Sequence, residues 1–311
     1  MKKESLRLAY GQALVELGRE DERIVVLEAD LGKSTMSILF QEEYPDRYFE
    51  MGIAEANMAS TAAGLSLVGK IPFIHSFAVF ASGRAYDQIR QSISIVGLNV
   101  KICGSSAGLS DFGDGSTHQS IEDMALMRAI PNMTVLVPVD AVETRKMVKA
   151  MVDWDGPVYI RINRNDLPVI TDPDSDFEIG KLQVVRDGSD VAVFANGVMV
   201  SMALEAAEEL AKDGISVKVI NASTVKPLTD EEVLAHVEGC RGVVTAEEHS
   251  IIGGLGSAVA SALRRERDLP IEFVGVKDSF GTSALSYEEL LNHYGLTADA
   301  IKDAVKVVLE G

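Results

Sequence analysis

Cysteine and tryptophan are scarce in this sequence, which holds two cysteines and one tryptophan among 311 residues. Cys103 and Cys240 are far apart along the chain, and neither belongs to a C-x-x-C pair. A disulfide framework or a thiolate metal site is therefore not expected, and both cysteines are predicted to be core residues. We predict no metal site built from the chain's own residues.

Basic residues are also few, since 29 Lys and Arg face 47 Asp and Glu and give a formal net charge of -18. Such a charge disfavours nucleic acid and anionic membrane surfaces as partners. No segment approaches the roughly 18 consecutive apolar residues of a membrane span, and the N-terminus lacks the apolar core of a signal peptide. We expect a cytoplasmic protein whose partners are small molecules or other proteins.

Helical and strand patterns alternate along the chain, and helices between short apolar strands indicate a parallel sheet covered on both faces. Helices are predicted over 5–18, 55–69, 85–97, 121–131, 142–154, 199–214, 254–266 and 300–310. Strands are predicted over 23–30, 71–77, 99–105, 134–139, 157–163, 181–188, 190–197, 215–223 and 242–249. The Pro, Asp and Ser residues of 171–180 are typical of a linker. The predicted fold class is α/β, with two domains, 1–170 and 181–311, each a mostly parallel sheet with helices on both faces.

Two glycine-rich segments are candidates for nucleotide or cofactor binding, and each lacks part of the motif that it resembles. In IIGGLGSAVA (251–260), Val259 stands where a dinucleotide fingerprint needs its third glycine, so tight packing of a helix on a strand is the preferred interpretation. In FGDGSTHQ (112–119), the GDG triplet matches the start of the diphosphate and metal motif of thiamine diphosphate enzymes. That motif closes with Asn-Asn, which this sequence does not contain, so the triplet alone predicts no binding.

A series of segments carries a resemblance to a known family. In chain order they are ESLRLAYGQAL, VLEADLGKS, RYFEMGIAEANM, PFIHSFAVFASGRAYDQIR, DFGDGSTHQSIEDMALMRAIP, PVYIRINRNDLP, AEEHSIIGGLGSA and VKDSFGTS. The first domain resembles the pyrimidine-binding domain of the transketolase family, and the remainder resembles the C-terminal domain that follows it. The family's N-terminal domain, which binds the diphosphate and magnesium of the cofactor, has no counterpart in this sequence.

The resemblance therefore implies the C-terminal subunit of a split transketolase. It implies thiamine diphosphate as cofactor, with Mg²⁺ or Ca²⁺ held mainly by a separate N-terminal subunit in an α2β2 assembly. The implied reaction transfers a two-carbon ketol unit between sugar phosphates.

Glu55, in the pattern G-I-x-E, is similar to the family's acid that hydrogen-bonds the cofactor's aminopyrimidine and promotes its imino tautomer. Its sequence neighbours Ile53, Ala54, Met58 and Ala59 are expected to form a pocket of low dielectric constant around it. The alternative is that Glu55 is only an acid at a helix N-terminus, stabilised by the helix dipole. The resemblance implies further cofactor contacts from Asp30, Gly52, Ile53, Phe77 and Phe80, of which the two phenylalanines stack on the pyrimidine ring.

The resemblance also implies a substrate site. Asp114 and His118 match the pair that hydrogen-bonds the donor's hydroxyls beside the reacting carbon, which gives His118 a catalytic role. Arg7, Arg164 and, less clearly, Ser34 match phosphate-binding positions, and a guanidinium suits a phosphate because of its bidentate fork.

The sequence departs from the family pattern at several positions. Ser106 stands where many transketolases have a substrate-site histidine, so the natural sugar is not specified. RAYDQ (84–88) resembles 1-deoxyxylulose 5-phosphate synthase instead. The alternatives are therefore a synthase of that kind, the beta subunit of a 2-oxoacid dehydrogenase, and a non-catalytic homologue that binds a partner. DGSTHQ and NRNDLP favour the sugar phosphate reaction over a short oxoacid.

Overall fold

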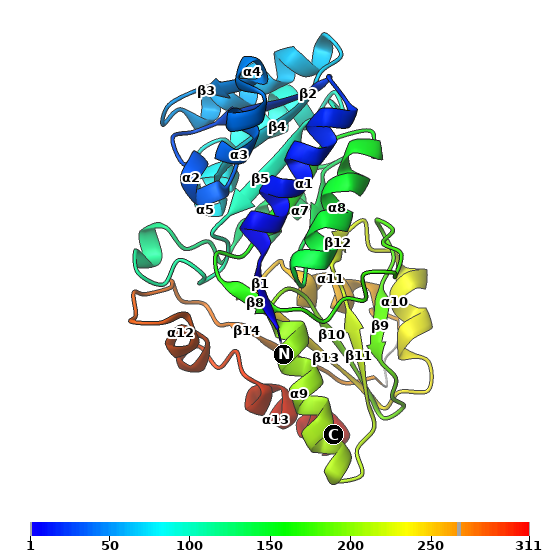
Figure 1. The fold of residues 1–311 in the computed structure, drawn as a ribbon. Helices are drawn as coiled ribbons and strands as arrows, with labels where there is room; N and C mark the ends of the chain where they lie inside the picture. The colour runs from blue at the N-terminus through cyan, green and yellow to red at the C-terminus, as the bar shows by residue number, and fades with distance from the viewer. Residues whose placement is uncertain (1, 266–268, 311) are drawn as a thin grey trace.

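The computed structural model describes residues 2–265 and 269–310 and has two α/β halves, each built around one sheet (Figure 1). The larger, seven-stranded sheet has the order β12-β6-β7-β5-β4-β2-β3. Its parallel strands are β2 (Ile24–Glu28), β3 (Tyr48–Glu50), β4 (Ile71–Phe77), β5 (Lys101–Ser105), β6 (Thr134–Leu136) and β7 (Val158–Ile162). The edge strand β12 (Thr224–Lys226) comes from the second half of the chain and runs antiparallel to β6.

Helices cover both faces of this sheet. One core cluster holds apolar side chains of α1 (Leu6–Glu20), α3 (Ile38–Glu43) and α8 (Ala141–Asp153). A second cluster holds those of α4 (Glu55–Leu67), α5 (Ala78–Gly83), the π-helix η2 (Ile89–Ser94) and α7 (Asp123–Ala129). The short elements are α2 (Gly32–Thr35), α6 (Tyr86–Gln88), η1 (Pro45–Arg47), η3 (Gly115–Thr117) and the antiparallel pair β1 (Lys3–Ser5) and β8 (Asp166–Pro168).

The smaller sheet has five strands in the order β14-β13-β10-β11-β9. Of these, β10 (Val191–Ala195), β11 (Val217–Asn221), β13 (Gly242–Ser250) and β14 (Ile271–Val276) are parallel, and β9 (Gln183–Arg186) is antiparallel to β11. Side chains of α9 (Met199–Lys212) and α13 (Ala298–Glu310) join the first core cluster. Those of α10 (Asp230–Val237) and α11 (Leu255–Ala262) form a third cluster, and α12 (Tyr287–His293) precedes α13.

The predicted α/β class with two mostly parallel sheets is confirmed. The pattern of apolar residues did not predict β14, α10 or α12, because these elements are short and partly exposed. The segment expected as a strand over 134–139 pairs only at Thr134–Leu136, and the expected helix 121–131 is limited to Asp123–Ala129. The expected helix 254–266 is α11, although its last residue, Glu266, lies outside the described residues.

The glycine-rich segment before α11 packs tightly, as its sequence predicts. A Cβ on Gly254 would lie 2.0 Å from the Glu247 carboxylate, and one on Gly256 would lie 2.5 Å from the Phe273 ring. The Glu247 carboxylate itself accepts the N–H groups of Leu255 and Gly256 at 2.7 and 2.8 Å. An internal acid thus occupies the position at this helix N-terminus where a phosphate would bind in a nucleotide site.

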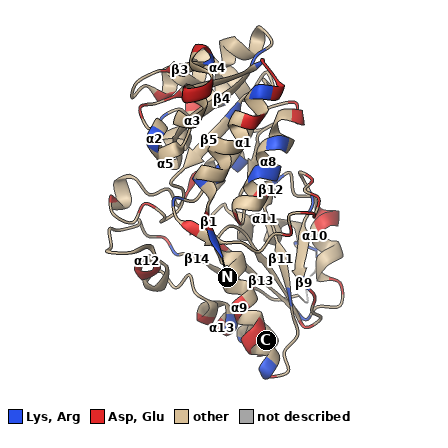
Figure 2. Ribbon diagram, viewed as in Figure 1, with Lys and Arg blue, Asp and Glu red and all other residues tan. Residues whose placement is uncertain are grey.

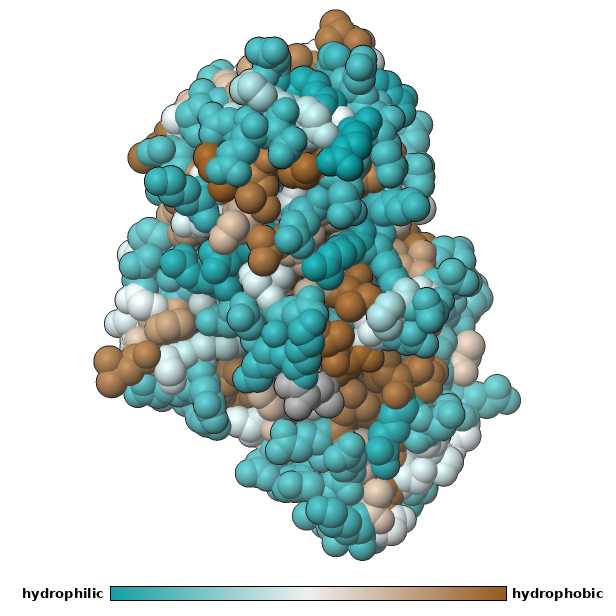
Figure 3. Space-filling model, in the orientation of Figure 1, coloured by the Kyte–Doolittle hydropathy of each residue, from teal (hydrophilic) through white to brown (hydrophobic). Residues whose placement is uncertain are grey.

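The expectation that both cysteines lie in the core holds fully only for Cys103. Cys103 is buried and Cys240 is half-buried, and both are free thiols. Asp and Glu residues occur in both halves of the molecule (Figure 2). In the described residues, no helix is long and apolar enough to cross a membrane. Hydrophobic residues do reach the surface in places (Figure 3). Five that are 59–74% exposed lie at or next to the ends of α4 and η2, namely Ile53, Leu67, Val68, Ile95 and Val96.

Candidate active site

Glu55 is the first residue of α4, and its side chain is only 4% exposed. Arg84, whose side chain is 52% exposed, donates a hydrogen bond from Nη1 to Glu55 Oε1 at 3.0 Å. The expected pocket of low dielectric constant is wrong in one respect, because Ile53 is 72% exposed. Ile53 lies in the turn that Gly52 makes with its φ of +67°, before the helix begins, whereas Met58 and Ala59 pack inside.

Three rings form one wall beside this carboxylate. Phe77 ends β4 and Phe80 lies in α5, and their ring centroids are 6.1 Å apart with an interplanar angle of 18°. His118 meets both rings edge-on, at 6.3 Å from Phe77 and 5.4 Å from Phe80. The guanidinium of Arg84 lies 4.0 Å from the centroid of Phe80. A flat cationic group therefore already stacks on this aromatic face, which shows that the face accepts a planar ligand.

His118 belongs to a loop, 111–119, that the second half of the chain holds in place. Gln119 Nε2 donates to the carbonyl oxygens of Asp111 and Thr282 at 3.1 and 2.9 Å, and the N–H of Ala284 donates to the carbonyl of Phe112 at 2.9 Å. Asp114 is exposed, and His118 Nδ1 pairs with Thr117 Oγ1 at 2.9 Å. Among the described residues, Asp114 and His118 make no hydrogen bond to each other, so both remain available to a ligand.

The predicted phosphate-binding residues lie together. Arg7, in α1, donates from Nε to the carbonyl of Arg164 at 3.1 Å and from Nη1 to the carbonyl of Ser34 at 2.7 Å. Burial and the neighbouring Arg164 charge lower the pKa of Arg7. Arg164 in turn donates from Nη1 to Asp111 Oδ2 at 2.8 Å. The sequence analysis did not single out Asp111, because it lies outside the DGSTHQ motif that identified Asp114.

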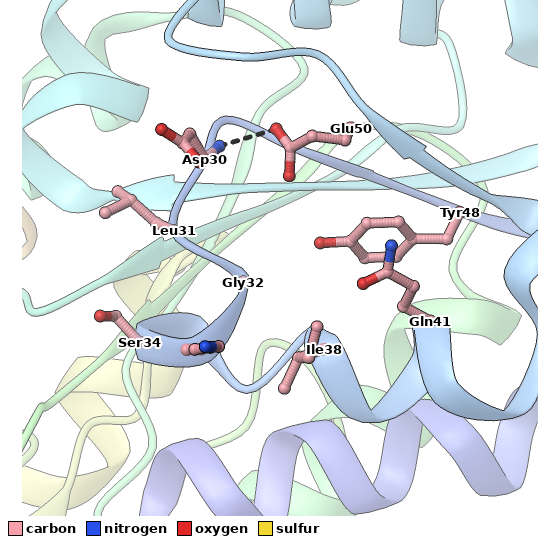
Figure 4. Close-up of a pocket in the computed structure, with 9 residues that line it drawn as sticks. Asp30, Leu31, Gly32, Ser34, Ile38, Gln41, Tyr48 and Glu50 are labelled. Carbon is pink, nitrogen blue, oxygen red and sulfur yellow. Dashed lines mark hydrogen bonds between the residues drawn. The ribbon is translucent and has the colours of Figure 1, made fainter.

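Asp30 lines a cavity of about 360 Å³ (Figure 4). Its φ is +61°, and its backbone N–H donates to Glu50 Oε1 at 2.9 Å. The cavity is lined by Asp30, Leu31, Gly32, Lys33, Ser34, Ile38, Gln41, Tyr48 and Glu50. Ser34 thus lies between this cavity and Arg7. Buried Glu28 holds the segment that follows β2, because its carboxylate accepts the hydroxyl of Thr35 at 2.7 Å. Burial raises the pKa of Glu28 to about 7.

A second buried network joins the halves of the chain behind the site. Glu248, on β13, accepts the N–H of Leu109 at 2.7 Å and Asn163 Nδ2 at 3.1 Å. Arg161 donates to Asp123 at 2.9 Å and to the carbonyl of Glu248 at 2.8 Å. Leu109 and Asn163 flank Asp111 and Arg164 in sequence, so the second half supports the arginine site directly.

The side chains of the site suit a flat heterocyclic ring, but they do not provide a metal site. The Glu55 carboxylate beside the stacked phenylalanines fits a flat heterocycle with a ring nitrogen. Within the described ranges, no three His, Cys, Asp or Glu side chains are grouped to hold a metal ion.

Two family models match the chain. Residues 2–169 match the transketolase pyrimidine-binding domain, and residues 180–301 match the transketolase C-terminal domain. The chain therefore belongs to the transketolase family. Its homologues indicate that it is part of a transferase.

Individual similar proteins indicate which part of a transketolase the chain corresponds to. The chain is 45% identical over 305 residues to the 6-deoxy-6-sulfo-D-fructose transketolase subunit SqwH of Clostridium sp. (strain MSTE9), covering 98% of this chain and 94% of that protein. It is 43% identical over 299 residues to a putative transketolase C-terminal section of Methanocaldococcus jannaschii, covering 95% and 93%. A solved structure, titled split gene transketolase, inactive beta4 tetramer, has a TM-score of 0.89 at 49% identity and 98% coverage of both chains. The chain thus corresponds to the C-terminal subunit of a split transketolase.

Proposed function

We propose that this subunit works with a separate N-terminal subunit and thiamine diphosphate to transfer a two-carbon ketol unit between sugars that carry an anionic terminus. The observation that carries the proposal is the placement of Glu55, only 4% exposed, beside the Phe77–Phe80 pair and His118. A carboxylate and a flat aromatic wall at one site are what recognition of an aminopyrimidine requires. When bound, the cofactor supplies a nucleophilic carbon that attacks the donor's carbonyl.

The chain's own residues take separate parts in this proposal. Glu55 hydrogen-bonds the pyrimidine ring nitrogen and holds a proton there, and Phe77 and Phe80 bind the ring face. Gly52, Ile53 and Asp30 complete the cofactor's surroundings. His118 and Asp114 bind the donor's hydroxyls, and His118 moves a proton at the reacting carbon's oxygen.

Arg7 and Arg164 bind the donor's anionic terminus in this proposal, with Ser34 beside them. Their guanidinium groups are held by carbonyl groups and by Asp111, and a short 2-oxoacid would have no use for them. This arrangement favours a sugar substrate over that of a 2-oxoacid dehydrogenase. A phosphate is the terminus that pentose phosphate chemistry provides, whereas the name of the SqwH relative indicates a sulfonate in that protein.

We also propose the assembly. The partner supplies the diphosphate and Mg²⁺ or Ca²⁺ ligands, and two copies of each chain form an α2β2 complex in the cytoplasm. Residues 1–170 act as the pyrimidine-binding domain, 171–180 as a linker and 181–311 as the C-terminal domain. Light scattering of the mixture at working concentration tests the stoichiometry, and a one-to-one complex would contradict it.

The deciding experiment mixes this chain with its N-terminal subunit, thiamine diphosphate and Mg²⁺. Ketol transfer from xylulose 5-phosphate to ribose 5-phosphate, or from a 6-sulfo ketose to the same acceptor, is expected only in the complete mixture. The isolated chain is expected to bind the cofactor weakly and to be inactive. Oxidative decarboxylation of a 2-oxoacid without ketol transfer would instead favour the dehydrogenase subunit, and no reaction with any donor would favour a non-catalytic homologue.

A further inference from the structure

The arginine pair has a buried acidic neighbour. Asp111 is 3% exposed, and its Oδ2 accepts Arg164 Nη1 at 2.8 Å. The backbone N–H of Arg164 donates at 3.2 Å to Oγ of Ser110, which precedes Asp111, so a second hydrogen bond holds the two segments together. Burial raises the pKa of Asp111, and the Arg164 guanidinium opposes this rise and favours the charged carboxylate. The hydrogen bond fixes this carboxylate next to whatever Arg164 binds.

The charges at this place can be counted. Arg7 and Arg164 are cations, and Asp111 is the acid in direct contact with one of them. Asp166 also acts on Arg7, but its side chain is exposed and water screens it. Within residues 2–265 and 269–310, neither Nη2 atom of the two arginines donates a hydrogen bond, so both Nη2 groups remain for a ligand. The pair therefore offers several donors but only one net positive charge.

We infer that Asp111 is a specificity-determining residue that makes the site favour a substrate terminus with one negative charge, such as a sulfonate, relative to the doubly charged phosphate. This inference rests on the proposed function, in which Arg7 and Arg164 bind the donor's terminus. The Asp111 carboxylate repels the ligand's charge, and this Coulomb energy is proportional to the number of charges on the ligand. A phosphate monoester carries close to two charges above pH 6, whereas a sulfonate carries one at every physiological pH.

Ser106 supports the same conclusion. It stands at the position where the family often has a histidine, is fully buried, and its hydroxyl has no hydrogen-bond partner among the described residues. No cation at this position replaces the charge that Asp111 cancels.

The test compares two ketose donors with one carbon skeleton, a 6-phosphate and a 6-deoxy-6-sulfonate, in the assembled complex. Asp111→Asn keeps the side chain's shape and an acceptor oxygen for Arg164 but removes the charge. We expect kcat/KM for the phosphate to rise about tenfold more than kcat/KM for the sulfonate. Asp166→Asn, which removes an exposed acid near Arg7, is the matched control and should leave the ratio within about twofold.

Equal changes for the two donors would overturn the inference and would make Asp111 only a positioning residue. That outcome leaves the proposed function intact, whereas an enzyme that transfers no ketol unit from either donor would remove the proposed function itself.

A second measurement varies the pH. The ratio of kcat/KM for phosphate over sulfonate in the parent enzyme should rise as pH falls from 8 to about 5.5, because the phosphate loses its second charge near pH 6. The charged groups around Asp111 are Arg7, Arg164, Asp114, His118 and Asp166, and they act on both donors. By the same Coulomb argument, a change of charge on any of them also acts more strongly on the phosphate, so the same pH series is measured with Asp111→Asn. The rise should be smaller in that variant, and a parental ratio that stays constant or falls would contradict the inference.

Discussion

Arg84 pairs with Glu55 and stacks on Phe80 at the same time. Its Nη1 lies 3.0 Å from Glu55 Oε1, and its guanidinium carbon lies 4.0 Å from the centroid of the Phe80 ring. A planar cation therefore fills the two positions that the proposed function gives to the cofactor's aminopyrimidine. In a chain without a partner, Arg84 satisfies a carboxylate that would otherwise be buried without a counterion.

Replacing Arg84 by Met is expected to tighten thiamine diphosphate binding to the assembled complex by a few-fold. The partly exposed ion pair contributes at most about 1 kcal/mol, which corresponds to about fivefold in a binding constant. Cofactor titration measured by calorimetry checks the value. Arg90→Met, at an exposed arginine of η2, is the control. Weaker cofactor binding in Arg84→Met would show that Arg84 supports the cofactor instead of competing with it.

Glu55→Gln should abolish cofactor activation without unfolding the protein. The amide keeps the side chain's volume and an acceptor for Arg84 but cannot hold the proton at the pyrimidine nitrogen. We expect hydrogen exchange at the cofactor's reactive carbon to slow by two to four orders of magnitude, with a melting temperature close to that of the parent. Quenched NMR of the assembled complex measures the exchange. A parental rate in the folded, cofactor-loaded variant would leave Glu55 as only a helix N-terminal acid.

Arg164→Ala should lower kcat/KM for a phosphorylated donor by about tenfold to a hundredfold, because a charge-assisted contact contributes about 1.5–3 kcal/mol. A phosphate-free donor should lose little. The substitution also leaves Asp111 buried without its partner, so the double variant Arg164→Ala with Asp111→Asn separates the two effects. If the double variant restores a phosphorylated donor to parental kcat/KM, Arg164 serves only to neutralise Asp111.

Stability should rise as pH falls from 8 to 6.5. Burial raises the pKa values of four glutamates, Glu28, Glu143, Glu247 and Glu248, to about 7 each. Since their folded pKa exceeds the unfolded one, the folded state binds more protons between about pH 4.3 and 7, and stability is lost as pH rises through 7. Burial lowers the pKa values of His75 and His249 to about 4, which opposes this trend below about pH 6.5.

Glu248→Gln isolates one of these groups. The amide is neutral throughout, and its oxygen still accepts the N–H of Leu109, so the variant should lose up to about 1 kcal/mol of the rise between pH 8 and 6.5. Urea unfolding midpoints at the two pH values measure the difference, with the exposed Glu231→Gln as control. An unchanged pH dependence would mean that Glu248 does not titrate in this range.

Local sequence determined most of the strands and helices of this protein. Runs such as IVVLE and VAVFA are apolar at every position because both faces of a parallel strand are covered, and this pattern is visible without the fold. The segment at β14 shows why the pattern can fail, since only the last three of its six residues are buried. The order of motifs along the chain likewise identified the residues for which the proposed function has roles, from Arg7 to Arg164.

Only the tertiary structure decided how these residues are paired. Asp111 meets Arg164 across 53 residues, and Glu248 meets Leu109 across 139, because the ends of parallel strands and the docking of the second half bring them together. Local propensity contains no information on such contacts, since each acid has the same immediate neighbours whether or not it finds a partner. The sequence by itself therefore determined which groups are present, whereas folding determined that one acid neutralises an arginine of the site, that another supports its loop, and that Arg84 lies between Glu55 and Phe80.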